Sequence, residues 1–285
     1  MSAFGIFRVS SLAWVLAKEF RNSSSIRKNL ADVLNELDCL ESSRAVGRVT
    51  EEEAKSEGSI IAPILWVKQE KAGGVVKNRL IHHDLLNFTY SRPKFSLARI
   101  SQELERIADF NELRKCDAEK YFYQFRVGQS SSKTLRFKIE VGGEVRFYEW
   151  KVMAMGMSGA PYTAQCTSNF LSDYYSRRFA IYSCVYLDDF WAEKSHQAPN
   201  FEVFAGDFGI RFKVSKTEEG SAITLLGVDI DLELKTAKIT ADKAENIEND
   251  ASLMLKSGMA TSKQLAVFYG RVESARDDKL RNSKS

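Results

Sequence analysis

Three aspartates are the side chains of this sequence best suited to hold divalent cations. Asp188 and Asp189 are adjacent, and Asp117 lies far upstream. Taken alone, an adjacent acid pair indicates a solvated turn, because Asp is common in hairpin loops. Mg²⁺, however, binds through only one or two carboxylates together with water and substrate phosphates. If the fold joins the three acids, they can hold the two ions that activate a hydroxyl and stabilise a leaving pyrophosphate in phosphoryl transfer.

The apolar pattern predicts that strand ends carry these acids. An apolar run at residues 113–116 leads into the first acid, and runs at 181–186 and 190–192 flank the acid pair, which predicts a hairpin tip. The other predicted elements are helices within 11–40 (broken at 22–25), over 96–107 with Ser96 as N-cap, over 161–177 and from 241 onward, and strands at 60–67, 75–81 (after a turn at 72–74), 137–141, 145–152, 223–230 and 238–240. Strands and helices without regular βαβ alternation predict an α+β fold.

Composition limits the class of protein. Of the 285 residues, 44% are hydrophobic and 28% are charged, as in soluble globular proteins. No run of about 18 apolar residues occurs, so no membrane partner is expected. The net charge of +3 is compatible with a nucleic-acid partner but does not argue for one. Four cysteines without a CxxC pair, and only three histidines, exclude a zinc knuckle or a zinc-dependent integrase module.

The dispersed cysteines and the N-terminal charge bear on the compartment. Isolated thiols suit a reducing interior, so an intracellular location, in the cytoplasm or the nucleus, is expected. The first thirty residues contain one acid, Glu19, among several basic residues. A mitochondrial presequence has this composition, as does an ordinary basic amphipathic helix, and the presequence stays open as an alternative.

The segments around the acids resemble the reverse transcriptases of retroelements. The matching segments are, in chain order, the fingers-like positions Lys68, Arg79, Asn87 and 95–100, the first palm motif at 117–125 (DAEKYFYQF), Gly156-Met-Ser-Gly-Ala-Pro161 with Gln165, the Tyr-x-Asp-Asp turn at Tyr186-Leu-Asp-Asp189, the fourth-motif lysine Lys216, and the primer grip at Leu226-Gly227. The family's order is kept across residues 60–275.

This resemblance implies a polymerase right hand. Fingers and a palm are expected, with an antiparallel palm sheet packed on helices and a thumb that is only begun or truncated. The implied domains are an N-terminal helical extension at 1–58, fingers at 59–112, a palm at 113–235 with a fingers insertion at about 125–150, and the start of a thumb or connection at 236–285. Few residues follow Lys216, so RNase H or other retroelement domains are expected to be missing from this chain.

Site roles follow from the matching positions. The implied catalytic residues are Asp117, Asp188 and Asp189, which together with the Ala118 carbonyl would ligate two Mg²⁺ ions, with Mn²⁺ as a substitute. The implied nucleotide-binding residues are Lys68, Arg79, Ala118, Phe122, Gly156 and Lys216. The implied primer and template residues are Gln124, Pro161, Tyr186, Leu226 and Gly227. For Lys216, a solvated loop lysine is an equally good interpretation.

Phe122 bears on the choice of sugar. It lies five positions after Asp117, where reverse transcriptases have an aromatic ring that leaves no room for a 2′-hydroxyl, the group that separates ribonucleotides from deoxynucleotides. A core aromatic is the other interpretation. Viral RNA-directed RNA polymerases carry an Asp at this position and an Asn where this chain has Thr167.

The implied function is that of a reverse transcriptase, a Mg²⁺-dependent nucleotidyltransferase that adds dNTPs to a primer 3′-hydroxyl. Its expected partners are an RNA template, and also DNA, with a DNA or RNA primer. An RNA-directed RNA polymerase and a non-catalytic, domesticated RNA-binding scaffold are the alternatives.

Two positions depart from the family pattern. His82 stands where most relatives carry an Asp, and Met155 replaces the usual Phe or Gln before Gly156. The segment 261–271 resembles tyrosine-recombinase (DIRS-like) elements more than long-terminal-repeat elements. A DIRS-like or Ty3-like retrotransposon is therefore the expected source.

Overall fold

The computed structural model describes residues 21–70, 76–88 and 94–276. The chain forms two compact units: unit 1 comprises Met1–Phe95 and Lys120–Cys166, and unit 2 comprises Ser96–Glu119 and Thr167–Ser285. The start of the expected N-terminal extension and the turn at 72–74 lie outside the described residues, and the expected domain boundaries stay predictions. Within the described ranges, no helix is both long and apolar enough to cross a membrane.

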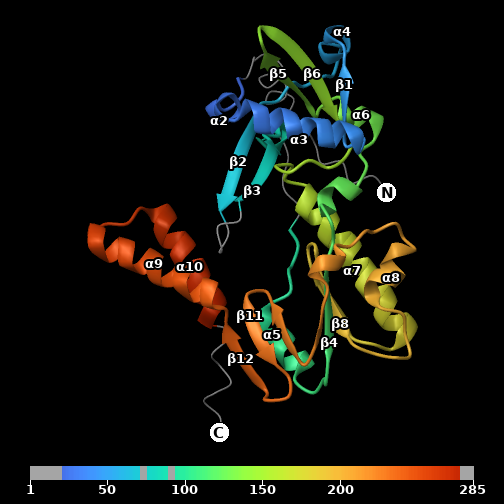
Figure 1. The fold of residues 1–285 in the computed structure, drawn as a ribbon, viewed down its shortest axis with the longest axis vertical. Helices are drawn as coiled ribbons and strands as arrows, with labels where there is room; N and C mark the ends of the chain where they lie inside the picture. Colours follow the sequence, from blue (N-terminus) through green and yellow to red (C-terminus); the bar gives the residue numbers. More distant parts are fainter. Residues whose placement is uncertain (1–20, 71–75, 89–93, 277–285) are drawn as a thin grey trace. The chain divides into compact units, whose positions relative to one another are not determined.

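Unit 1 contains two antiparallel sheets with short helices beside them (Figure 1). Its elements are α2 (Ser24–Lys28), α3 (Leu30–Ser42), β1 (Val46–Val49), α4 (Glu51–Ala54), β2 (Ile64–Glu70), β3 (Val76–His82), η2 (Leu85–Phe88), η3 (Tyr121–Gln124), α6 (Gln129–Ser132), β5 (Arg136–Val141), β6 (Glu144–Trp150) and the start of α7 (Ala160–Phe179). The sheet orders are β1-β6-β5 and β2-β3.

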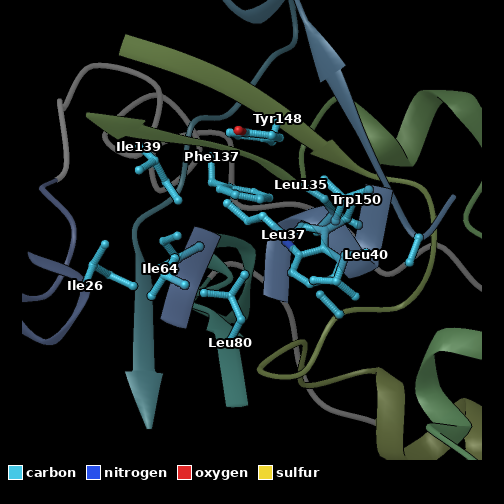
Figure 2. Close-up of a cluster of buried hydrophobic side chains, with 14 of the residues drawn as sticks. Ile26, Leu37, Leu40, Ile64, Leu80, Leu135, Phe137, Ile139, Tyr148 and Trp150 are labelled. Atoms are coloured by element: carbon cyan, nitrogen blue, oxygen red, sulfur yellow. The ribbon is translucent and has the colours of Figure 1, made fainter. Parts of the chain in front are cut away.

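The core of unit 1 forms where α3 packs on the β5–β6 hairpin (Figure 2). Leu37 and Leu40 lie three residues apart on one face of the helix, and both are buried. From the hairpin, the ring of Phe137 stacks on Tyr148 at 5.3 Å and packs at 5.7 Å from Trp150. Burying each large apolar side chain stabilises the fold by about 1.5–3 kcal/mol.

The break expected at 22–25 is confirmed only in part. Residues 21–23 are not helical, but α2 already begins at Ser24, with Ser23 as its N-cap: the Ser23 hydroxyl accepts a hydrogen bond from Ser25 N at 3.3 Å. A further interruption, which was not expected, falls at Asn29 between α2 and α3. Polar residues that stop a helix and those that cap one are the same types, so composition did not place the helix start within this stretch.

Unit 2 contains a four-stranded antiparallel sheet of order β7-β8-β4-β9 and a three-stranded sheet of order β10-β11-β12. Its elements are α5 (Ile100–Ile107), β4 (Leu113–Asp117), the rest of α7, β7 (Ser183–Tyr186), β8 (Asp189–Glu193), α8 (Phe201–Gly206), η4 (Val214–Lys216), β9 (Glu218–Gly220), β10 (Ala222–Leu225), β11 (Val228–Asp231), β12 (Thr236–Ile239), α9 (Ala241–Ser257) and α10 (Ser262–Arg276). The predicted α+β class with antiparallel sheets is confirmed.

In unit 2, one local prediction fails and one strand was missed. Ser96 does not cap α5, because the helix begins with its buried face at Ile100 and Arg99 occupies the cap position. Strand β9 was not predicted, since its residues are polar and carry no apolar alternation. It forms through pairing with β4, with Glu218 opposite Lys115.

Candidate active site

Antiparallel pairing brings the three acids together at one end of the β4–β8 pair. Asp117 is the last residue of β4 and lies directly opposite Asp189, the first residue of β8. The next amide, Ala118 N, donates to the carbonyl of Asp188 at 2.8 Å. Buried neighbours on both strands, Cys116 and Phe190, keep this register because a one-residue slip would expose them.

Lys216 reaches the same place from η4. The backbone amide of Lys213 donates to the Asp117 carbonyl at 2.9 Å, which ties the start of η4 to the end of β4. One helical turn later, the Nζ of Lys216 forms an ion pair with Asp117 Oδ2. The ammonium therefore sits among the acids predicted to bind metal.

The carboxylates of this cluster repel one another. Burial, together with the charges of Asp188 and Asp117, raises the pKa of Asp189 to about 6, against the opposing effect of the nearby Lys115 and Lys216. The raised pKa means that the ionised form of Asp189 is disfavoured, and a cation bound nearby would stabilise that form. Lys115 was missed by sequence reasoning, although it lies two residues before Asp117 and therefore on the same face of β4.

The donor set fits hard divalent cations. Carboxylate and carbonyl oxygens are the ligands that Mg²⁺ prefers, and one or two carboxylates suffice when substrate phosphates complete the shell. No group of three or more His, Cys, Asp or Glu side chains in the described segments is already arranged around a metal position. The arrangement instead suits ions shared between Asp117, Asp188 and a substrate.

Comparison with known proteins identifies the family. Residues 74–230, more than half of the chain, match the family described as reverse transcriptase (RNA-dependent DNA polymerase). The chain belongs to the reverse transcriptase family. No relative among the curated proteins matches it.

Two solved structures of the foamy viral protease-reverse transcriptase in complex with double-stranded DNA share the fold. One, designated dRH, has a TM-score of 0.63 at 16% sequence identity, over 91% of this chain and 42% of that one. The other has a TM-score of 0.61 at 15% identity, over 90% of this chain and 50% of that one. Such low identities establish the fingers–palm polymerase fold alone, and the chain spans half or less of either protein.

The other family positions in unit 2 belong to its core and turns. Tyr186 packs against the buried cluster around Trp191. Leu226 and Gly227 form the two-residue turn between β10 and β11 with φ of 51° and 80°, the left-handed geometry that such hairpins require. These residues have structural roles within unit 2.

The positions expected to bind the triphosphate lie in unit 1. On β2, Lys68 forms an ion pair with Asp32 at 3.1 Å. On β3, the Nε of Arg79 is buried, and no hydrogen-bond partner for it exists among the described residues.

The aromatic segment that follows the first palm motif is a 3₁₀ helix, η3, entered through a left-handed Lys120 with φ of 46°. Tyr121 is buried, and Tyr123 packs at 5.6 Å from Trp150 of the unit 1 core. Phe122 between them is only half-buried. The helix also contains Gln124, and Pro161 lies in the first turn of α7, where its missing N–H costs nothing.

Gly156 has a structural reason to be glycine. Its φ is +104°, and a Cβ at this position would lie 2.0 Å from the carbonyl oxygen of His82. The close approach is held by His82 N, which donates to Met155 O at 2.8 Å, and by Asn87 Nδ2, which donates to Gly156 O at 2.8 Å. His82 and Met155, the two positions that depart from the family pattern, are therefore joined by a backbone hydrogen bond next to Gly156.

The side chain of His82 is buried at 0% exposure, with neither ring nitrogen hydrogen-bonded in the described structure. Burial lowers its pKa from 6.5 to about 3. The imidazole of the unfolded chain therefore takes up a proton below pH 6.5 that the folded chain does not, and stability is lost as the pH falls from 6.5 towards 3. Asp84 has the opposite effect on the pH dependence of stability. Burial raises its pKa from 3.8 to about 6, so the stability that it contributes to the folded chain is lost as the pH rises from 3.8 through 6.

We expect His82→Leu to gain stability relative to the parent as the pH falls from 7 to 4, by up to about 1.4 kcal/mol per pH unit. Asp84→Asn is the counterpart, and its gain relative to the parent should instead grow as the pH rises from 4 to 6.5. Urea unfolding of parent and variants across this range measures both effects. If the free energy of unfolding changed with pH in the same way for the parent and both variants, the burial of His82 and of Asp84 would not contribute to the pH dependence of stability.

Proposed function

We propose that this chain is an RNA-directed DNA polymerase of a retroelement that adds deoxynucleotides to a primer 3′-hydroxyl. One observation carries the proposal: Asp117 lies opposite Asp189 on paired strands, and the Asp188 carbonyl accepts a hydrogen bond from Ala118 N. A carboxylate cluster of this kind is what two-metal phosphoryl transfer requires. Membership of the reverse transcriptase family supports the same reaction.

The chain's own residues divide the work of the reaction. When bound, two Mg²⁺ ions, or Mn²⁺ in their place, would supply polarisation of the attacking hydroxyl and neutralisation of the pyrophosphate charge. Asp117 and Asp188, with the Ala118 carbonyl, would hold them, and Asp189 adds a third negative charge nearby. Lys216 would pass from Asp117 to the phosphates, where its ammonium neutralises the leaving group or donates a proton.

Nucleotide and nucleic-acid contacts are proposed for the remaining family positions. Arg79 and Lys68 would bind the triphosphate, Lys68 by exchanging its partner Asp32. The proposed primer and template contacts are Gln124, Pro161, Tyr186, Leu226 and Gly227. The partners would be an RNA or DNA template and a DNA or RNA primer inside the cell, and the tail at 261–271 supports a DIRS-like element as the source.

Primer extension tests the proposal directly. A labelled DNA primer on an RNA template is incubated with the chain and either dNTPs or rNTPs, with Mg²⁺, Mn²⁺ or EDTA. We expect extension with dNTPs and either metal, and none with EDTA. Extension with rNTPs alone would indicate an RNA polymerase, and template binding without extension under any condition would indicate a scaffold; either result contradicts the proposal.

Phe122→Val should admit ribonucleotides. A smaller side chain opens space at the sugar, so we expect the preference for dNTP over rNTP to fall at least tenfold, about 1.4 kcal/mol in transition-state energy. Single-nucleotide incorporation with each substrate measures the ratio. Phe125→Val, which removes a half-buried ring three residues along the chain, is the matched control and should keep the parent's selectivity. Unchanged selectivity in both variants would remove the proposed role of Phe122.

A further inference from the structure

The turn that carries Asp188 contains a strained residue. Leu187 links β7 to the acid pair with φ of 54°, in the left-handed region that a side chain with a Cβ rarely adopts. Such a conformation is energetically unfavourable for a residue other than glycine. It persists only where the surrounding structure holds it.

Two hydrogen bonds hold this turn on either side of Asp188. The hydroxyl of Ser168 on α7 donates a hydrogen bond to the carbonyl oxygen of Leu187 at 2.8 Å. Ala118 N donates to the carbonyl of Asp188 at 2.8 Å. The Leu187 carbonyl belongs to the peptide group before the Asp188 Cα, and the Asp188 carbonyl to the group after it. Both peptide planes that set the direction of the Asp188 side chain are therefore fixed from outside the hairpin.

Ser168 makes this contact from a buried position on α7. Its side chain is fully buried at 0% exposure, within unit 2 like the turn itself. Ser172 and Ser176 lie one and two helical turns further along α7, and their hydroxyls lie 2.8 Å and 2.9 Å from the hydroxyl of Ser183. These two bonds anchor the start of β7, whereas the Ser168 bond reaches the acid turn at its end.

We propose that Ser168 is a positioning residue for the metal-binding acids. Its hydroxyl locks Leu187 in the left-handed conformation and thereby sets where the Asp188 carboxylate points. The proposal rests on the proposed function only for its consequence in catalysis. The geometric claim, that Ser168 orders the turn, stands separately and is tested separately.

The experiment compares Ser168→Ala with Ser172→Ala in the full chain. Both variants remove one buried hydroxyl from the same helix, so both should lower the urea unfolding midpoint by similar amounts. Only Ser168→Ala should loosen the acid turn. Hydrogen–deuterium exchange at the Ala118 amide, which donates to Asp188, should then speed up at least tenfold in Ser168→Ala and less than twofold in Ser172→Ala.

Metal binding and catalysis are measured on the same proteins. Mn²⁺ titration followed by electron paramagnetic resonance should show a dissociation constant at least fivefold higher for Ser168→Ala, and within twofold of the parent for Ser172→Ala. In primer extension, kcat should fall at least tenfold with KM for dNTP within twofold. Ser168→Thr keeps the hydroxyl and should recover the Ala118 exchange rate and kcat.

Equal exchange rates at Ala118 in the two alanine variants would overturn the proposal, whatever the activity. An equal change, or no change, in Mn²⁺ affinity and kcat in an active parent would overturn the catalytic consequence. If the parent extends no primer while Ser168→Ala still speeds exchange at Ala118, the ordering of the turn is supported and the polymerase assignment fails. The two failures are therefore distinguishable.

Discussion

Asp188→Asn abolishes primer extension: we expect kcat to fall by at least about 10³-fold, equivalent to about 4 kcal/mol. The amide has nearly the shape of the carboxylate but no charge to hold a divalent ion. Asp188 is exposed at the tip of the turn, so its loss should change the free energy of unfolding by less than about 0.5 kcal/mol. Single-turnover extension and urea unfolding measure the two quantities.

Asp207→Asn is the matched control for this prediction. Asp207 is an exposed carboxylate at the C-cap of α8 in the same unit, and its variant should extend primers like the parent. Because the Asp188 charge raises the pKa of Asp189, a carboxyl titration by NMR should also show a lower Asp189 pKa in Asp188→Asn. Full activity in Asp188→Asn would end the assignment of these acids to metal binding.

Gly156→Ala should strongly destabilise unit 1. The new Cβ would lie 2.0 Å from the His82 carbonyl oxygen, and that backbone is held on both sides by hydrogen bonds. Alanine also disfavours the φ of +104°. We expect a loss of about 3 kcal/mol or more in the free energy of unfolding, from backbone strain combined with overpacking.

Gly128→Ala provides the comparison. Gly128 is exposed, its φ is −66°, and a Cβ there would meet nothing within 4 Å. Because it occupies the N-cap of α6, alanine should cost only about 0.5–1 kcal/mol. Chemical unfolding of both variants measures the difference. If Gly156→Ala lowered the free energy of unfolding no more than Gly128→Ala does, the backbone near His82 would be able to move away from the new Cβ at little cost.

The acid-bearing hairpin illustrates what the sequence alone could predict. The apolar runs around Asp117 and the acid pair identified the strands, because burial on one face repeats every second residue. The same runs predicted that the two strands flanking the acid pair form a hairpin, but periodicity does not say that the strand ending at Asp117 is their neighbour. The structure supplies the register, with Asp117 opposite Asp189.

Boundaries and polar contacts were predicted less well. Local composition could not say where in the polar stretch 22–25 the cap of α2 lies and the helix begins. Burial of His82 was also hidden, because a histidine at a strand end is as compatible with solvent as with the core until Gly156 approaches it. Ser168 had one available signal, its helical spacing with the buried Ser172, which indicated a polar stripe on α7 without a partner for it.

The sequence by itself determined the fold class, most of the strands and helices, and the identity of the acids, because these depend on local periodicity and on motifs read in order. Only the tertiary structure decided that Lys216 pairs with Asp117, that β9 adds to β4, and that Ser168 holds a left-handed Leu187. Each of these joins residues far apart in the chain. The hydrophobic pattern of the sequence does not indicate the partners of polar side chains or of backbone groups. These contacts therefore become evident only when the packed helices and strands bring the groups within hydrogen-bonding distance.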